Sequence, residues 1–203
     1  TFGQKTYNGV AILSRHPMRD VVRNIPGHTD EQARVIAATM DTPAGELRLV
    51  NCYFVNGQAP GTDKFAYKML WLTALHRWLR EELLAHPRLA LVGDFNVAPE
   101  DRDSFDPVGL KDTIHHTVEE RQHFQDLIAL GLTDTFRMFE QPEKSYSWWD
   151  YRMLGFQKNR GLRIDHILVS DALRASVTAC TIDRAPRKNP QPSDHAPVVL
   201  TMA

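Results

Sequence analysis

Four short polar motifs are spread along the chain, and each stands where an apolar stretch ends. Gly93-Asp94-Phe95-Asn96 follows Leu89-Ala90-Leu91-Val92, and Asp165-His166 follows Leu162-Arg163-Ile164. The other two motifs are Asn51-Cys52-Tyr53 and Ser193-Asp194-His195. Metal-assisted phosphodiester hydrolysis needs a carboxylate or amide that holds a cation, a base that orients water, and a donor that takes up charge on the phosphorus. These motifs supply all three, so we predict that they form one active site.

Asp94 and Asn96 are separated by one residue. In an extended segment both side chains would point to the same face, where a carboxylate and an amide could converge on one water or metal ion. The alternative interpretation is an Asx turn, which is a common structural use of Asp and Asn at strand ends. Both interpretations remain open at the level of sequence.

A histidine and a carboxylate form the second predicted pair. An imidazolium can stabilise charge that develops on a phosphorane, and a neighbouring carboxylate raises the proton affinity of the ring and fixes its orientation. We assign these roles to His195 and Asp165 respectively. His166 is expected to be a structural histidine.

The motifs also occur in a recognisable order along most of the chain. From Tyr7-Asn8-Gly9-Val10 the order runs through the motif at 93–96, then Asp134-Thr135-Phe136-Arg137, then the segments 147–152 and 160–165, and ends with 193–198. This ordered set resembles the exonuclease III and abasic-site endonuclease family. The resemblance implies a four-layered α/β/β/α sandwich of two mostly antiparallel sheets. It also implies a Mg²⁺ or Mn²⁺ cofactor and, as substrate, double-stranded DNA that is abasic or 3′-blocked.

Residue roles follow from the same resemblance. Asp94 would orient or deprotonate the attacking water, and Asn96 would position that water and the phosphate. The implied catalytic residues are Tyr53, Asp94, Asn96, Asp165 and His195. The implied metal ligands are Asp94, Asn96, Asp194 and His195. The implied DNA contacts are Asn56, Trp148 and Arg160, with Tyr53 and Asn56 at the phosphate. A half-buried tyrosine at a sheet edge is the alternative for Tyr53.

The beginning of the chain departs from the family pattern. Members open with a strand that ends in asparagine and a second strand whose glutamate is the principal metal ligand, whereas this sequence opens at Thr1-Phe2-Gly3-Gln4. We therefore expect an N-terminally incomplete fold, with a gap in one sheet and without the main metal carboxylate. Two alternatives stay open. One is a catalytically incomplete fragment that only binds DNA, and the other is a superfamily phosphoesterase that acts on a lipid or inositol phosphate.

Composition sets the remaining bounds. A chain of 203 residues, with 42% hydrophobic and 24% charged residues, predicts one globular domain spanning 1–203. Lys plus Arg number 24 against 25 for Asp plus Glu, so any basic DNA-binding face must be local. The segments 152–163 and 184–188 are the candidates. Two cysteines without metal spacing predict a reducing, cytoplasmic setting. We expect no membrane segment and a monomer.

Hydrophobic periodicity predicts the elements that position the motifs. A helix over 63–85, capped by Asp63, and a second helix over 118–130, closed by Gly131, have apolar residues at helical spacing. The predicted strands are 10–13, 34–40, 47–54, 89–92, 146–149, 163–169, 176–183 and 196–202, with a hairpin turn at 41–45. His115 and His116 are read as a solvated helix entry, with a place near the nucleotide pocket as the weaker hypothesis.

Overall fold

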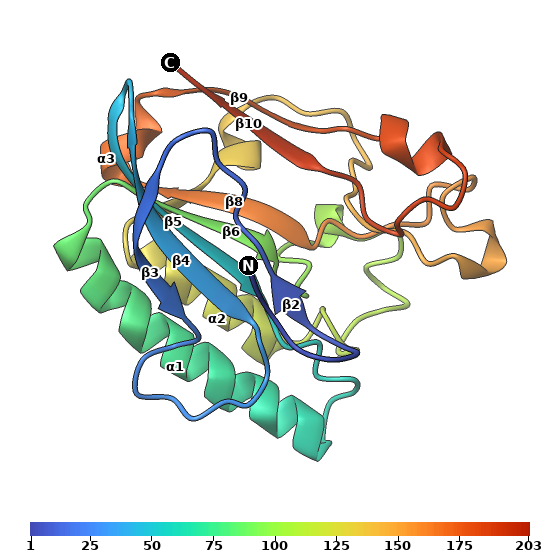
Figure 1. Ribbon diagram of the computed structural model, residues 1–203. Coiled ribbons are helices and arrows are strands. Elements are labelled where there is room, and N and C mark those ends of the chain that lie inside the picture. Colours follow the sequence, from blue (N-terminus) through green and yellow to red (C-terminus); the bar gives the residue numbers. More distant parts are fainter.

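A six-stranded mixed sheet forms the centre of the computed structural model, which describes residues 1–203 (Figure 1). The strand order is β3-β4-β5-β6-β8-β7. Their bounds are β3 Met18–Arg23, β4 Val35–Thr42, β5 Gly45–Tyr53, β6 Leu89–Asp94, β7 Leu132–Asp134 and β8 Asp165–Ser170. The chain is thus of the expected mixed α/β class.

The predicted hairpin is confirmed. β4 and β5 pair antiparallel down to Thr42 opposite Gly45, which leaves Pro43 and Ala44 as the loop. β5 then pairs with β6 in parallel, and the helix between them makes the crossover that a parallel pair requires. At Gly93, φ is +133° and a Cβ would lie 1.9 Å from the Cys52 carbonyl oxygen. Only glycine permits this approach of β5 and β6 next to Asp94.

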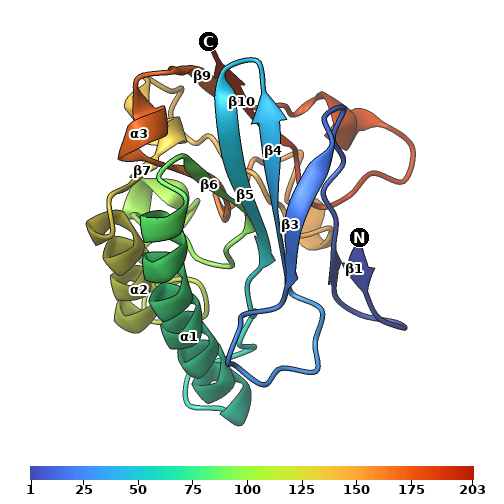
Figure 2. The same ribbon diagram turned by 60° about the vertical axis from the view of Figure 1, so that its left-hand side comes forward.

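Two long helices cover one face of the sheet and lie side by side in Figure 2. Helix α1 spans Asp63–Ala85 and helix α2 spans Val118–Ala129. The buried stripe of α1 contains the predicted Leu72, Leu75 and Leu79, and it is widened by Trp71 and Trp78. Together with the inward side chains of the central strands, these residues form the main core.

The cap of α1 differs from the prediction by one residue. Thr62, not Asp63, is the N-cap, because the Thr62 hydroxyl accepts a hydrogen bond from the Phe65 backbone N–H at 3.2 Å. Asp63 is instead the first helical residue, where its charge favours the positive end of the helix dipole. Helix α2 ends as predicted, before Gly131 at φ +91°.

We predict that Thr62→Ala lowers the free energy of unfolding by about 1 kcal/mol, because the first turn of α1 loses its capping acceptor. Urea denaturation followed by far-UV circular dichroism measures the change. Thr73→Ala on the exposed side of the same helix is the matched control and should cost nothing, since alanine has the higher helix propensity. Equal losses in the two variants would contradict the capping role.

A second, two-stranded sheet lies over the opposite face (Figure 1). It consists of β9 (Val177–Ile182) and β10 (Val198–Met202), paired antiparallel. Side chains such as Val177, Leu200 and Met202 pack between it and outward residues of β6 and β8. A further short pair, β1 (Phe2–Gly3) with β2 (Gly9–Val10), stands beside β4 and β5.

The remaining regular segments are short. They are α3 Asp171–Arg174 and the 3₁₀ turns Asp101–Asp103, Thr135–Met138, Arg152–Leu154 and Ala185–Lys188. The prediction of a strand at 146–149 is wrong: this segment makes only isolated bridges, from Trp148 to Leu162 and to His195. Strands β3 and β7 were not predicted, because β3 is mostly exposed and polar and β7 has three residues. No helix has the length and apolar character needed to cross a bilayer.

Candidate active site

Three predicted catalytic residues lie in a row across adjacent strands. Tyr53 at the end of β5 is paired with Asp94 at the end of β6, and Asp94 is paired with Asp165 at the start of β8. Side chains of a strand alternate between faces, and Leu91 and Leu168 on these strands point into the helix-side core. The three catalytic candidates therefore share the face opposite α1 and α2.

His195 completes this row from the loop before β10. Its Nδ1 lies 2.9 Å from Asp165 Oδ2 and 3.0 Å from Asp165 Oδ1. Burial by itself would lower the pKa of His195. The hydrogen bond and charge of Asp165, helped by Asp94 and Asp194, instead raise it to about 9. The ring is thus an imidazolium near neutral pH, and together with Asp94 and Asp165 it lines a cleft of about 600 Å³.

Asp94 and Asn96 form a closed unit. The Asn96 backbone N–H donates to Asp94 Oδ1 at 2.9 Å, and Asn96 Nδ2 donates to Asp94 Oδ2 at 3.0 Å. The extended geometry considered above is wrong here, because Asn96 is left-handed (φ +50°) and its side chain folds back onto the carboxylate. Burial, followed by the charge of Asp165, raises the pKa of Asp94 to about 7.

One further amide, that of Asn56, and the phenol of Tyr53 lie near Asp94 and Asn96. Asn56 is exposed, and its Nδ2 donates to Asn96 Oδ1 at 3.0 Å. Burial and the charge of Asp94 raise the pKa of Tyr53, so the phenol keeps its proton and can donate a hydrogen bond. The guanidinium of Arg34 lies 5.2 Å from the centre of the Tyr53 ring. The predicted phosphate-contacting groups therefore stand beside the predicted catalytic ones.

Trp148 links the carboxylates to a neighbouring pocket. Its Nε1 donates to Asp194 Oδ2 at 3.0 Å, and its ring lines a pocket of about 520 Å³. Arg160 is exposed at the same pocket, with its guanidinium 4.8 Å from the Phe105 ring centre. Asn56 and Arg160 are thus exposed and Trp148 is half-buried, and Arg160 shares with Trp148 the pocket that adjoins Asp194.

The two histidines at 115 and 116 do not form a solvated helix entry. His116 is buried and its Nε2 lies 3.0 Å from Ser104 Oγ, while His115 Nδ1 donates to the Asn96 carbonyl at 2.7 Å. Burial, followed by the charge of Lys68, lowers the pKa of His115 to about 4, so this ring is neutral. Both side chains line the pocket beside Trp148, which fits the weaker hypothesis made from sequence.

The basic face is smaller than the sequence indicated. Arg163 is buried, and its guanidinium contacts Asp103 Oδ1 at 2.7 Å and Asp134 Oδ2 at 2.8 Å. Arg187 is also buried, over the rings of Tyr151 and Phe156. Neither arginine can serve as a surface contact, because partners distant in sequence enclose both. His166 is structural, as predicted: it is buried, with Nε2 3.1 Å from the Val97 carbonyl oxygen.

Two functional candidates were missed from the sequence, namely Lys68 of α1 and Glu120 of α2. They form a buried ion pair directly beneath Asn96. A signal was present, since Lys68 stands three and four residues before Trp71 and Leu72 on the apolar stripe of α1. Glu120 belongs to a Thr-x-x-Glu capping box, whose sequence signature is recognisable.

Asp94 and Asp194 are the carboxylates that could bind a divalent metal ion. No three His, Cys, Asp or Glu side chains are grouped as a complete protein cage. Mg²⁺ does not require one, since it is held by one or two carboxylates together with waters and substrate phosphate. Burial and then the charge of Asp165 raise the pKa of Asp94, and a divalent cation at this carboxylate would offset both effects. Asp94 and Asp194 therefore fit such an ion.

Comparisons with known proteins agree with this geometry. The model of the endonuclease/exonuclease/phosphatase family matches residues 1–195. Exodeoxyribonuclease III of Haemophilus influenzae is 35% identical over 97% of this chain and 77% of its own length. The structure of a 3′ phosphatase, NExo from Neisseria, bound to a product DNA hairpin has a TM-score of 0.95 and 46% identity, covering 99% of this chain and 77% of that one.

A third relative has the same fold at lower identity. An AP endonuclease from Archaeoglobus fulgidus has a TM-score of 0.86 and 29% identity, over 93% of this chain and 72% of that one. The match to the family model covers nearly the whole chain. The chain belongs to the endonuclease/exonuclease/phosphatase family and, within it, to the exonuclease III and abasic-site endonuclease relatives.

Proposed function

We propose that this protein is a DNA-repair phosphoesterase that hydrolyses DNA at abasic sites, at 3′ ends, or at both. The observation that carries the proposal is the row of Tyr53, Asp94 and Asp165 across β5, β6 and β8, with His195 hydrogen-bonded to its last member. The relatives are named as an exodeoxyribonuclease, a 3′ phosphatase and an AP endonuclease, which favours DNA over a lipid or inositol phosphate.

Each residue of the row has a distinct part in the proposed reaction. Asp94 holds a water molecule and accepts its proton. Asp165 keeps His195 protonated, and the opposite ring nitrogen donates a hydrogen bond to a phosphoryl oxygen. The Tyr53 hydroxyl and the Asn56 amide orient the phosphate. The Asn96 amide instead holds Asp94, because its two N–H groups go to Asp94 Oδ2 at 3.0 Å and to the Phe54 carbonyl at 3.1 Å.

A divalent ion, Mg²⁺ or Mn²⁺, is the proposed cofactor, with Asp94 and Asp194 as its carboxylate ligands. When bound, such an ion stabilises negative charge on the phosphate oxygens. Asn96 is a weaker candidate ligand, since its Oδ1 accepts from Asn56 and its Nδ2 donates to Asp94. His195 is better assigned to proton donation than to metal ligation, because a ligand nitrogen must be unprotonated.

Cleavage assays test the proposed function. The substrates are a duplex with one abasic site, a duplex with a 3′-phosphate, and an inositol phosphate, each with Mg²⁺, with Mn²⁺ and with EDTA. We expect metal-dependent hydrolysis of at least one duplex and none of the inositol phosphate. DNA binding in anisotropy measurements without hydrolysis would favour the binding-only alternative, and turnover of only the inositol phosphate would refute the DNA assignment.

Metal binding should also appear in the unfolding equilibrium. At a Mg²⁺ concentration a hundred times its dissociation constant, we expect a stabilisation of about 2.7 kcal/mol, because the ion binds only the folded protein. Thermal denaturation with MgCl₂, against KCl of equal ionic strength, measures the effect. Asp194→Asn should reduce the shift if Asp194 is a ligand, and an unchanged shift would exclude it.

Substrate choice is expected to depend on the pocket that His115 and His116 line. His115→Ala enlarges this pocket next to Trp148, so the ratio of kcat/KM for the abasic duplex to kcat/KM for the 3′-phosphate duplex should change. His123→Ala on α2 does not touch this pocket and serves as the matched control. Identical ratios in wild type and His115→Ala would discard the specificity role.

We also propose that residues 1–203 form a single domain and that the protein is a monomer. Light scattering after size exclusion tests the oligomeric state, and a single cooperative calorimetric transition tests the domain count.

A further inference from the structure

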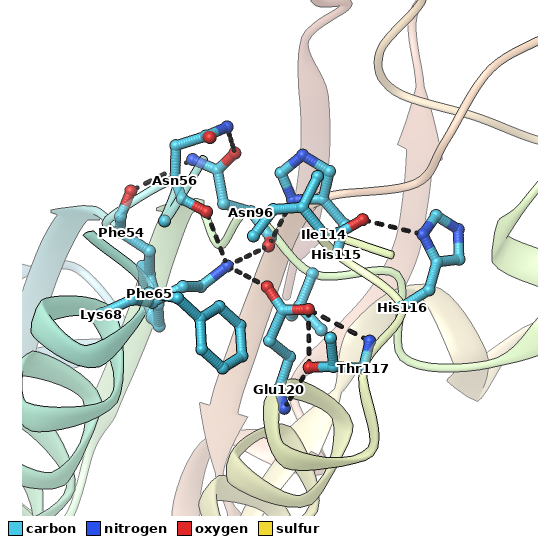
Figure 3. A network of polar contacts seen from close by, with 12 residues as sticks. Phe54, Asn56, Phe65, Lys68, Asn96, Ile114, His115, His116, Thr117 and Glu120 are labelled. Atoms are coloured by element: carbon cyan, nitrogen blue, oxygen red, sulfur yellow. Dashed lines mark hydrogen bonds and ion pairs between the residues drawn. The ribbon is translucent and has the colours of Figure 1, made fainter. Parts of the chain in front are cut away.

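A buried ion pair joins the two long helices directly beneath the proposed phosphate site. Lys68 of α1 contacts Glu120 of α2, and their side chains are 1% and 0% exposed. Figure 3 shows the ammonium of Lys68 between Glu120, Asn56 and Asn96. A buried charge is costly unless it is paired and hydrogen-bonded, so a pair in this place needs a reason other than stability.

All three donors of the Lys68 ammonium are used within the protein. They go to the Asn96 carbonyl at 2.8 Å, to the Asn56 carbonyl at 3.2 Å, and to Glu120 Oε1. An ammonium group has three N–H donors and no acceptor. Lys68 therefore has no donor left for DNA, and any effect it has on the reaction must pass through the residues it holds.

The two residues that Lys68 holds carry the amides next to the reacting groups, Asn56 at the proposed phosphate position and Asn96 at Asp94. Asn96 is in the left-handed region, which turns its carbonyl inward to accept from both Lys68 and His115. Its side chain then points the other way, where Nδ2 donates to Asp94 and Oδ1 accepts from Asn56. The Asn96 amide also donates to the Phe54 carbonyl at 3.1 Å. Lys68 thus fixes the backbone from which the two side-chain amides project, and Asp94 and Phe54 complete the contacts of the Asn96 amide.

Gly57 leaves space for the side chain of Lys68, and Thr117 fixes its partner Glu120. At Gly57, φ is +86° and a Cβ would lie 2.9 Å from Lys68 Cδ, so glycine leaves room for the lysine stem. Glu120 is fixed in turn, because its Oε2 accepts from the Thr117 backbone N–H at 3.1 Å and from the Thr117 hydroxyl at 2.9 Å. The ammonium is therefore held from below by the N-terminus of α2.

We propose that Lys68, oriented by Glu120, is a positioning residue that sets the side-chain amides of Asn56 and Asn96 relative to Asp94. This inference rests on the proposed function, in which Asn56 orients the phosphate and Asn96 holds Asp94. Lys68 supplies a fixed cation beneath the strand ends, and it couples the packing of α1 against α2 to the geometry of the site.

The test compares two buried ion pairs that each include one residue of α1. Lys68→Met keeps most of the stem volume but removes the ammonium. Arg48→Met removes the buried pair between Arg48 and Glu82 at the far end of α1, where the Arg48 guanidinium contacts Glu82 at 2.7 Å and nothing in the site. Both variants should lose stability, since each leaves a carboxylate without its partner.

Activity separates the two variants. Per folded enzyme, we expect kcat to fall about 10- to 100-fold in Lys68→Met, with KM for DNA nearly unchanged, because a misplacement of reacting groups by about 1 Å can cost about 100-fold. Arg48→Met should keep its kcat. Adding Lys68→Met to Asn96→Ala should lower kcat less than about twofold further, because residues that act through one another are not additive.

A second readout requires no turnover. In ¹⁵N spectra, we expect the side-chain NH₂ signals of Asn56 and Asn96 to move toward free-amide positions in Lys68→Met and to stay in place in Arg48→Met. Unmoved signals, or an equal kcat in wild type and Lys68→Met, would overturn the inference. A wild-type protein inactive on every DNA substrate would overturn the proposed function instead, and the amide signals would still decide the positioning role.

Discussion

Asp94→Asn is expected to lower kcat for DNA hydrolysis by about 1,000-fold, the size of effect that removal of a positioned general base produces. The side chain keeps its shape but can no longer accept a proton from water. Single-turnover cleavage of the preferred duplex measures the loss. Asp41→Asn near the end of β4, where the side chain is 78% exposed, is the matched control and should retain full activity.

The same substitution distinguishes catalysis from folding. The pKa of Asp94 is raised from 3.8 to about 7, so the folded state holds a proton that the unfolded state has released. Without metal, the stability contributed by this proton is present below pH 4 and is lost as the pH rises toward 7. Asp94→Asn should remove this contribution to the pH dependence of the free energy of unfolding, and the variant should remain folded at pH 7. Unfolding of the variant, or kcat within tenfold of wild type, would contradict the assignment.

Loss of His195 is expected to have the second largest effect. His195→Gln should lower kcat by about 100- to 1,000-fold, as removal of one donor to a developing oxyanion does. Because the protonated ring is the active form and its pKa is about 9, wild-type activity should fall as the pH rises through about 9. Asp165→Asn removes the main group that raises this pKa. In this variant, the fall of activity at alkaline pH should therefore begin at a lower pH than in the wild type.

Stability should follow the same ionisation. The folded pKa of His195 is above the ordinary value of 6.5, so its contribution is complete below pH 6.5 and is lost as the pH rises through about 9. Urea denaturation from pH 6 to pH 10 checks the sign. His16→Gln at an exposed position is the control and should leave both profiles unchanged. An alkaline limb that does not move in Asp165→Asn would remove Asp165 from its proposed role.

Local patterns in the sequence were sufficient for much of this description. The end of each apolar stretch indicated that Tyr53, Asp94 and Asp165 stand at the ends of strands, although the predicted strand at 89–92 stopped before Asp94. The recurrence of Leu72, Leu75 and Leu79 determines the buried stripe of α1. The order of the polar motifs was enough to indicate the family, since it needs no knowledge of which strands are neighbours.

The tertiary structure decided everything that depends on partners distant in the chain. Asp94 and Asp165 are neighbours because β6 pairs with β8, and His195 reaches Asp165 because the loop before β10 returns to the start of β8. Arg163 is buried only because Asp103 and Asp134 reach it from other segments. The pair of Lys68 and Glu120 arises in the same way, from the packing of α1 against α2. Local sequence specifies which face a side chain takes on its own element, whereas burial, pairing and ionisation are set by neighbours that only the folded chain brings together.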